Sequence, residues 1–274
     1  MKIESFKRDD IVHFLKLAKS EDWVVEQWEL DFLLSEYSNG CFTAKRGNGE
    51  RAGYVTALRH DRSGWIGNLI VESKYRGAGV GERLFVSALG SLRSEGVETF
   101  WLTASESGKR LYEKYGFQNM DTITRWAGTI APISDLPYDD SDNRSISNSL
   151  SSIDCKVWGD RRDALLNVTT GRGVLIQKKS GFLVLQPSGC DVLLAPFISD
   201  NEDGALRIFN DAIRVIPSGT KYFVDAPLSN KSAHQLYESF DMTIVGQNIL
   251  MYAGRAPEYR PEMLYGLATM GSCG

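Results

Sequence analysis

The chain has 274 residues, of which 42% are hydrophobic and 24% are charged, so it can bury a sizeable core and fold as one large domain or two ordinary ones. Its 31 Lys and Arg against 35 Asp and Glu give a formal net charge of −4, which argues against a nucleic-acid or membrane partner because both usually require a basic excess. The mixed charges of its start and the lack of any apolar run of about 18 residues lead us to expect a cytoplasmic protein.

Neither disulfide nor metal chemistry is indicated. The cysteines are Cys41, Cys155, Cys190 and Cys273, far apart and without a C-x-x-C pair. The three histidines stand at no metal-ligand spacing. We therefore expect reduced thiols and no bound metal.

The first half of the chain combines helical and β-like patterns. Apolar residues at helical spacing predict two helices with a bend between residues 11 and 34. The runs GCFTAKR, AGYVTALR and GWIGNLIV then fit an antiparallel meander, because the turn-forming segments GNGE and HDRSG separate them. A glycine loop leads into a helix that ends at Gly96, and the strand VETFWLTAS, a helix that ends at Gly116 and a strand over about 118–126 follow.

The second half repeats this order after a change in composition. Residues 128–155 are rich in Ser, Asp, Asn and Pro and read as a linker. Beyond them, a short helix near 160–166 precedes the β-like runs GVLIQKK, GFLVLQP and DVLLAPFI, and a helix, the strand KYFVDAP, a helix and a strand complete the series. LYEKYGF (111–117) is matched by LYESFDM (236–242), which indicates a duplication. The apolar tail LYGLATMGSCG is expected to pack against the body.

The segment RGAGVG, residues 76–81, has the chemistry of an anion-binding loop. It joins a strand ending in NLIV to a helix, so backbone N–H groups and the positive end of the helix converge there. Glycine permits a positive φ and removes the Cβ that would keep an anion away from those amides, and Arg76 adds a fixed charge. The alternative is a tight turn whose glycines only ease packing. ATP and NAD are disfavoured, because neither the G-x-x-x-x-G-K-[ST] spacing nor a βαβ context is present.

Two segments resemble one enzyme family. RGAGVG resembles the [R/Q]-x-x-G-x-[G/A] pyrophosphate loop of the GNAT N-acetyltransferase superfamily, and LYEKYGF, about 35 residues later, resembles its second signature segment. Through the segments GWIGNLIV, LTASESGKRLYEKYGF and FVDAPLSNKSAHQLYESF, the whole chain further resembles a two-domain bacterial group of the YitH type. The resemblance implies an α+β fold of tandem GNAT domains, each with a mixed, mostly antiparallel twisted sheet flanked by helices. The catalytic domain that binds acetyl-CoA would span residues 1–128, a linker 129–155, and a GNAT-like domain without a phosphate loop 156–274.

The resemblance also assigns roles to individual residues. The backbone before the loop would bind the pantetheine arm of acetyl-CoA, the loop would hold the pyrophosphate, and one serine stands where the family often has asparagine. These positions are Leu69, Ile70 and Val71, then Arg76, Gly77, Ala78, Gly79, Val80 and Gly81, then Ser105. Tyr112 would protonate the departing CoA thiolate, since a phenol with a pKa of about 10 keeps its proton at neutral pH. The alternative is that Tyr112 only packs on CoA, and Tyr115 is expected to be a core residue.

The group that removes the amine proton is left open. Some family members use a glutamate on the strand before the loop, but GWIGNLIV contains no carboxylate. The candidates are Glu26, Glu29, Glu106 and His60, and a water relay or capture of the free amine is equally compatible with the sequence. By resemblance, segments holding Trp23, Trp28 and Trp65 flank the acceptor cleft, although large aromatic residues are often core residues.

The second half is not expected to bind acetyl-CoA. Its counterpart of the glycine loop reads SDNEDGAL, in which Asp200, Glu202 and Asp203 would repel a pyrophosphate and Gly204 is the glycine that remains. Tyr237 would then be a packing relic. This half would shape the acceptor cleft or the surface of a homodimer.

The predicted function is transfer of acetyl from acetyl-CoA to a small-molecule amine by direct attack in a ternary complex. Direct attack follows from the family and from the lack of a cysteine near the signature segments that would carry the acyl group. The alternatives are a non-catalytic acetyl-CoA sensor or scaffold, and a protein N-terminal acetyltransferase.

Overall fold

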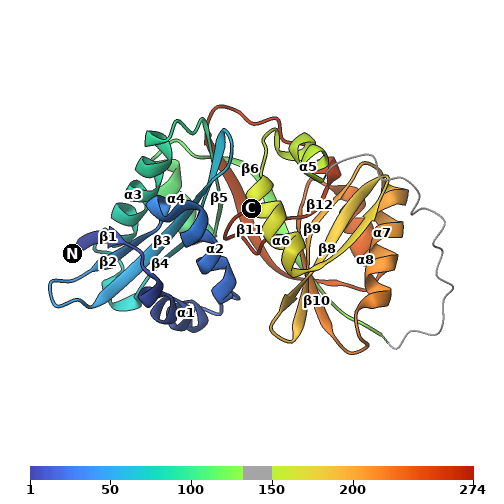
Figure 1. Cartoon of the computed structure of the whole chain (residues 1–274), viewed down its shortest axis with the longest axis horizontal. Helices are drawn as coiled ribbons and strands as arrows, with labels where there is room; N and C mark the ends of the chain where they lie inside the picture. Colours follow the sequence, from blue (N-terminus) through green and yellow to red (C-terminus); the bar gives the residue numbers. More distant parts are fainter. Residues whose placement is uncertain (132–149) are drawn as a thin grey trace.

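The computed structural model describes residues 1–131 and 150–274, and its helices and strands form two similar series along the chain (Figure 1). The first series consists of β1 (Lys2–Ser5), α1 (Ile11–Ser20), α2 (Gln27–Tyr37), β2 (Phe42–Lys45), β3 (Arg51–Arg59), β4 (Ser63–Val71), α3 (Val80–Ser94), β5 (Thr99–Ala104), α4 (Glu106–Glu113) and β6 (Gln118–Thr129). The second series consists of α5 (Leu150–Trp158), α6 (Asp163–Arg172), β7 (Val174–Lys178), β8 (Gly181–Ser188), β9 (Asp191–Ser199), α7 (Glu202–Val215), β10 (Lys221–Pro227), α8 (Lys231–Ser239), β11 (Thr243–Gly254) and β12 (Leu264–Gly266).

Most of the expected elements are present, and three additional ones appear. The sequence patterns did not predict β1, α5 or β12. Helix α5 occupies residues that were expected to belong to the 129–155 linker, because Ile153, Val157 and Trp158 follow its serine-rich start and are buried. The rest of the predicted linker, from residue 132 to 149, lies outside the described residues.

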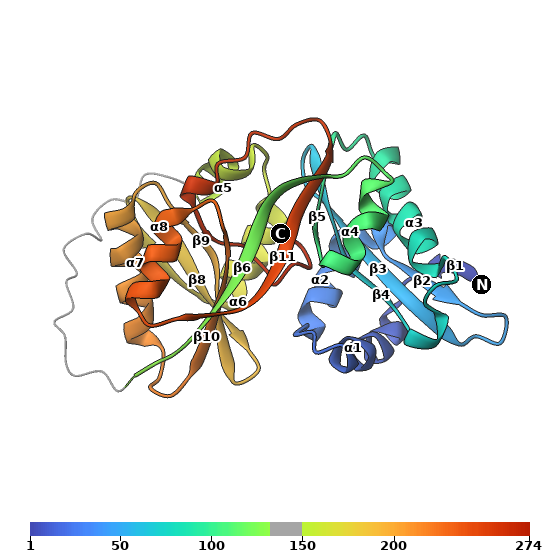
Figure 2. The ribbon, with the colours of Figure 1, turned by 180° about the vertical axis from the view of Figure 1, so that it is seen from behind.

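All the strands belong to one mixed sheet, in which the two halves exchange strands. The order is β1-β2-β3-β4-β5-β11-β6-β10-β9-β8-β7, with β12 added beside β9. Strand β11 pairs antiparallel with β5 and β6, and β6 pairs antiparallel with β11 and β10. Both views show β6 and β11 side by side between the two halves (Figures 1 and 2). The predicted boundary at residue 128 therefore falls at the end of a strand whose hydrogen-bond partners both come from the second half.

Buried aromatic residues fill the junction between the halves. The Trp158 ring of α5 meets Trp101 of β5 edge to face, with ring centroids 5.5 Å apart, and lies 6.1 Å from Trp65 of β4. The Arg162 guanidinium stacks 4.3 Å from the Trp158 ring and pairs with Asp154 at 2.6 Å, both side chains being buried. A buried pair of this kind leaves neither charge without a partner. This cluster fixes α5 against the strands of the first half.

Each half contains two parallel strands that pair over a short stretch and then separate, which leaves a gap in the sheet. Strands β4 and β5 pair in parallel over Ser63–Trp65 and Thr99–Trp101 and then separate. Helix α3 packs against β3 and β4, and α4 packs against β5 and β11. The equivalent pair is β9 and β10, with α7 packed against β8 and β9. The gap beyond Trp65 lies beside the glycine loop and α4.

Candidate active site

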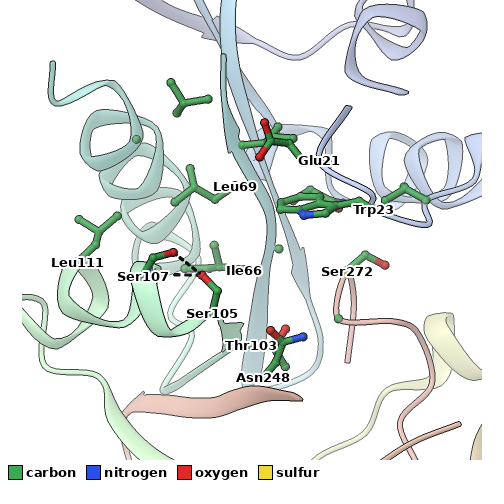
Figure 3. Close-up of a pocket in the computed structure, with 18 of the residues that line it drawn as sticks. Glu21, Trp23, Ile66, Leu69, Thr103, Ser105, Ser107, Leu111, Asn248 and Ser272 are labelled. Carbon is green, nitrogen blue, oxygen red and sulfur yellow. Dashed lines mark hydrogen bonds between the residues drawn. The ribbon is translucent and has the colours of Figure 1, made fainter. Parts of the chain in front are cut away.

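A pocket of about 680 Å³ lies where β4 and β5 separate. Its wall includes the end of β4, the glycine loop, the start of α4, the connection between α1 and α2, and residues 270–272 near the end of the chain. Figure 3 shows Ser105, Ser107 and Leu111 on one side of this pocket and Trp23 and Ser272 on the opposite side. Segments from both ends of the chain therefore meet at one cavity.

The structure brings nearly all the predicted site residues to this pocket. The predicted residues that line it are Leu69, Ile70, Val71, Arg76, Gly77, Gly79, Val80, Gly81, Ser105 and Tyr112. Ala78 is exposed and is not one of the lining residues, so only the backbone of the loop could serve a ligand at that position.

The glycine loop leaves the start of α3 open. Gly77 and Gly79 have φ of 76° and 73°, in the left-handed region that favours glycine. Gly79 is the N-cap of α3, and no side chain caps this end. A Cβ at Gly77 or Gly79 would meet no atom within 4 Å. The first amides of α3 thus face open space, which is the arrangement that binds anions.

Arg76 is held beside this loop. Its Nε donates to the Val71 carbonyl at 2.9 Å, and its Nη2 donates to Glu21 at 2.6 Å. Both Arg76 and Glu21 line the pocket. The guanidinium has a further nitrogen, Nη1, which makes no hydrogen bond to any residue the structure describes. The positive charge is therefore positioned at the mouth of the pocket.

Tyr112 has a buried ring and a hydroxyl without a partner among the described residues. The ring lies against Phe85, with centroids 5.1 Å apart, and the residue is only 9% exposed. Within residues 1–131 and 150–274 nothing hydrogen-bonds to the hydroxyl. Burial raises the pKa of Tyr112 to about 12, so the phenol keeps its proton at neutral pH. Tyr115 differs, because it is half-buried and its hydroxyl donates to Glu82 at 3.0 Å.

Ser105 is the N-cap of α4. Its hydroxyl accepts a hydrogen bond from the Gly108 amide at 3.2 Å and lies 3.1 Å from the Ser107 hydroxyl. Asn230 caps α8 in the same way, accepting from the Ala233 amide at 3.0 Å. Serine thus performs the capping that asparagine performs in the second half.

Of the four candidate bases, only Glu29 lines the pocket. Its Oε1 accepts from the Glu26 amide at 3.2 Å, and its Oε2 accepts from the Ser272 hydroxyl. Burial raises the pKa of Glu29 to about 7. Glu26 instead accepts from the Gly189 amide at 2.8 Å and pairs with an arginine of α6, and Glu106 is exposed. His60 is half-buried and lies outside the pocket lining, and desolvation of its ring lowers its pKa to about 3.

The contribution of residues 270–272 was not predicted. The Trp65 indole donates to the Gly271 carbonyl at 3.1 Å, so this segment runs along β4. A Cβ at Gly67 would lie 2.3 Å from the Ser272 carbonyl oxygen, so only glycine permits this approach. The apolar tail was expected to pack against the body, but its place at the pocket was not; a glycine inside a strand, such as Gly67, often marks close contact with another backbone.

Of the three tryptophans that were candidates for the acceptor cleft, one lines the pocket and two do not. Trp23 is 40% exposed and lines the pocket, whereas Trp65 is 1% exposed and belongs to the junction cluster. Trp28 lies outside the pocket lining, under the Arg172 guanidinium at 4.4 Å.

Comparison with known proteins identifies the family. Two family profiles, each described as an acetyltransferase (GNAT) domain, match residues 38–119 and 150–266. The chain belongs to the GNAT acetyltransferase superfamily. It contains two GNAT domains in tandem and is an acyltransferase. No curated protein matches the sequence.

Solved structures share the tandem GNAT fold along the whole chain. A Pyrococcus horikoshii protein described as an acetyltransferase has a TM-score of 0.84 and 22% identity, covering 100% of this chain and 95% of its own. A GCN5-related N-acetyltransferase from Sphaerobacter thermophilus has a TM-score of 0.64 and 16% identity, with 98% and 97% coverage. An acetyltransferase from Thermoplasma acidophilum has a TM-score of 0.59 and 13% identity, with 93% and 100% coverage. At these identities the likeness concerns the fold.

In the second GNAT domain, the chain itself fills the corresponding gap. Strands β9 and β10 pair at Leu193 and then separate, and β12 pairs with β9 beyond that point, Leu264 opposite Ile198. The Tyr237 hydroxyl donates to the Tyr265 carbonyl, whereas the matching Tyr112 of the first domain lines the pocket. The place equivalent to the first pocket is therefore occupied by protein.

The start of α7 is closed as well. Asn201 caps it, accepting from the Gly204 amide at 2.7 Å. A Cβ at Gly204 would lie 2.2 Å from the Ser180 hydroxyl oxygen, so the helix start packs against protein instead of opening to a ligand. Glu202 and Asp203 in the first turn add negative charge, so this end of α7 is capped and acidic, which disfavours an anion.

Two further findings concern the described residues as a whole. None of their helices is both long and apolar enough to cross a membrane. Nor do they contain a group of three or more His, Cys, Asp or Glu side chains that could hold a metal ion.

Proposed function

We propose that the first GNAT domain transfers acetyl from acetyl-CoA to the amine of a small molecule, by direct attack in a ternary complex. The observation that carries this proposal is the single pocket that joins the open glycine loop, Tyr112 and a buried carboxylate. We further assign the chain to the two-domain YitH-type group, with residues 1–128 as the catalytic domain and 156–274 as a GNAT-like domain without a phosphate loop.

The residues of the pocket suit two parts of acetyl-CoA, its pyrophosphate and its pantetheine arm. The uncapped amides of α3 and the charge of Arg76 suit a pyrophosphate. On the side that faces β5, Leu69–Val71 of β4 have no partner strand among the described residues, because β5 has already diverged. In the second domain the equivalent edge of β9 pairs with the extended chain of β12. This pairing supports an extended pantetheine arm, with its amide groups, at the edge of β4.

Tyr112 would act as the proton donor to the departing sulfur. When the amine nitrogen bonds to the acetyl carbonyl carbon, the C–S bond breaks and the sulfur must be protonated or stabilised as a thiolate. Tyr112 lines the pocket, and its raised pKa keeps the proton on the hydroxyl. No cysteine lines the pocket, which supports direct attack over an acyl-enzyme route.

Small acceptors fit better than large ones. Met270, Gly271 and Ser272 line the pocket on one side, and Trp23 comes from the connection between α1 and α2. These segments narrow the space beside β4, where an extended peptide would otherwise lie.

The proposal predicts that thiol is released from acetyl-CoA when small primary amines are added. The test is a thiol-release assay with the full chain over a panel of small alkylamines and short peptides with a free N-terminus, corrected for hydrolysis without amine. Rates should be higher with small amines. Faster turnover of peptides would favour an N-terminal acetyltransferase. Stabilisation by acetyl-CoA without turnover of any acceptor would contradict the enzyme and favour a sensor.

A further inference from the structure

Among the charged residues that line the pocket, Glu29 is the one that is buried. Glu21 is paired with Arg76, and Arg125 makes two hydrogen bonds to Asp225, at 2.7 and 2.6 Å. Glu29 is 7% exposed and forms no ion pair with any residue that the structure describes. A buried carboxylate without a cation is costly, and such a group in a cleft is a candidate for function.

Two hydrogen bonds from different parts of the chain fix the Glu29 carboxylate. The Glu26 amide, at the start of α2, donates to Oε1, and the Ser272 hydroxyl, 243 positions away, donates to Oε2. Glu29 is in the first turn of α2, whose positive end favours a negative charge. A carboxylate has about four acceptor positions, so each oxygen can accept a further hydrogen bond from a ligand.

We propose that Glu29 binds the ammonium group of the acceptor, that Ser272 positions it, and that Glu29 takes the first proton the amine loses. This inference rests on the proposed function and specifies its substrate as a primary alkylamine that is cationic in water. A buried anion selects a cation over a neutral acceptor, because the cation supplies the missing charge partner.

The proton balance is complete with these groups. The ammonium transfers one proton to a Glu29 oxygen, and the neutral nitrogen then bonds to the acetyl carbonyl carbon. The C–S bond breaks, and the sulfur receives the Tyr112 proton. The nitrogen returns its second proton to the Tyr112 oxygen, and Glu29 releases its proton to solvent. The products are an amide, free CoA thiol and one proton.

The environment of Glu29 sets the direction of the pH dependence. Burial raises its pKa to about 7, the Ser272 hydrogen bond lowers it, the Glu26 carboxylate raises it and the Arg172 guanidinium lowers it. The Cys273 thiol, next to Ser272, is buried with its own pKa raised, so it is neutral. Glu29 is therefore protonated below about pH 7 and gains its charge above it. The kcat/KM for the amine should rise through about pH 7.

The test compares Glu29→Gln and Ser272→Ala with Glu36→Gln, an exposed position of the same helix outside the pocket. Glutamine retains the acceptor for the Glu26 amide, so folding is preserved. We expect Glu29→Gln to lower kcat/KM for the amine by about 10²-fold or more and to abolish the inflection near pH 7. Ser272→Ala should raise the KM for the amine by about 10-fold and move the inflection to higher pH, because it removes a hydrogen bond that favours the carboxylate. Glu36→Gln should behave like the wild type.

Acetyl-CoA affinity separates this inference from the function on which it rests. The dissociation constant of acetyl-CoA should change by less than about 3-fold in all three variants, because none of the three residues is assigned to acetyl-CoA binding. An unchanged amine kcat/KM or an unchanged pH profile in Glu29→Gln would overturn the role of Glu29. A wild type that neither binds acetyl-CoA nor releases thiol would instead overturn the proposed function, and this inference with it.

Discussion

Replacing Tyr112 by Phe should lower kcat by about 10²–10³-fold while leaving the dissociation constant of acetyl-CoA within about 3-fold. The Tyr112 ring is anchored against Phe85 and Phe117, and phenylalanine preserves those contacts. The variant loses only a hydroxyl that has no partner within the described part of the chain. Steady-state thiol release and a direct binding measurement give the two constants.

Tyr115→Phe is the matched control for this loss. Tyr115 lies three residues further along, contacts the same Phe85 ring and donates to Glu82, but it does not line the pocket. Its variant should retain wild-type kcat. Wild-type kcat in both variants would show that Tyr112 only packs and donates no proton, because phenylalanine keeps the ring contacts.

Gly79→Glu should abolish detectable binding of acetyl-CoA. The new carboxylate would stand at the N-cap of α3, where it would cover the amides and repel a pyrophosphate. Acetyl-CoA at about 100 times its dissociation constant should stabilise the wild type by about 2.7 kcal/mol, and the variant should gain nothing. Thermal unfolding with and without acetyl-CoA measures both.

Gly49→Glu is the matched control, because it places the same side chain at another glycine with a positive φ, away from the pocket. Gly49 has φ of 81° and, like Gly79, no atom within 4 Å of an added Cβ, but it lies in the turn before β3. Both variants should lose about 1–2 kcal/mol of intrinsic stability, from the left-handed conformation. Only Gly79→Glu should lose the response to acetyl-CoA. A preserved response in Gly79→Glu would mean that the glycines form a packing turn.

Local patterns in the sequence were sufficient for most elements and for the first-domain loop. The period of the apolar residues predicts whether a segment is a helix or a strand, and the spacing of glycines predicts where no side chain covers the backbone amides. RGAGVG and Tyr112 combine both kinds of signal, which is why nearly all the residues assigned from them line one pocket. Helix α5 was not predicted, because the serine-rich start of Leu150–Trp158 resembles in composition the linker before it.

Strand exchange could not be predicted in this way. A strand pattern shows which face is buried but not which neighbour pairs with it, and β6 and β11 have equivalent positions in two similar domains. The exchange follows from long-range pairing, such as Ile249 opposite Ala104. The role of Ser272 is similar, because it depends on a contact with Glu29 across 243 positions.

The two similar domains differ at the start of the equivalent helix and in the gap beside the equivalent strand. The first has glycine at the N-cap of α3 and an open gap beside β4. The second has Asn201 at the equivalent cap, and β12 fills the gap beside β9. The segment that fills the gap in the second domain continues to Ser272, so it also lines the first pocket.

The most direct measurement of this account is the number of acetyl-CoA molecules bound per chain, obtained by calorimetric titration of the wild type. The open glycine loop of the first domain and the filled gap of the second predict one. Two molecules per chain would show that β12 leaves its place and that the second domain binds as well. No binding at concentrations that saturate other acetyl-CoA enzymes would contradict the assignment of the first pocket.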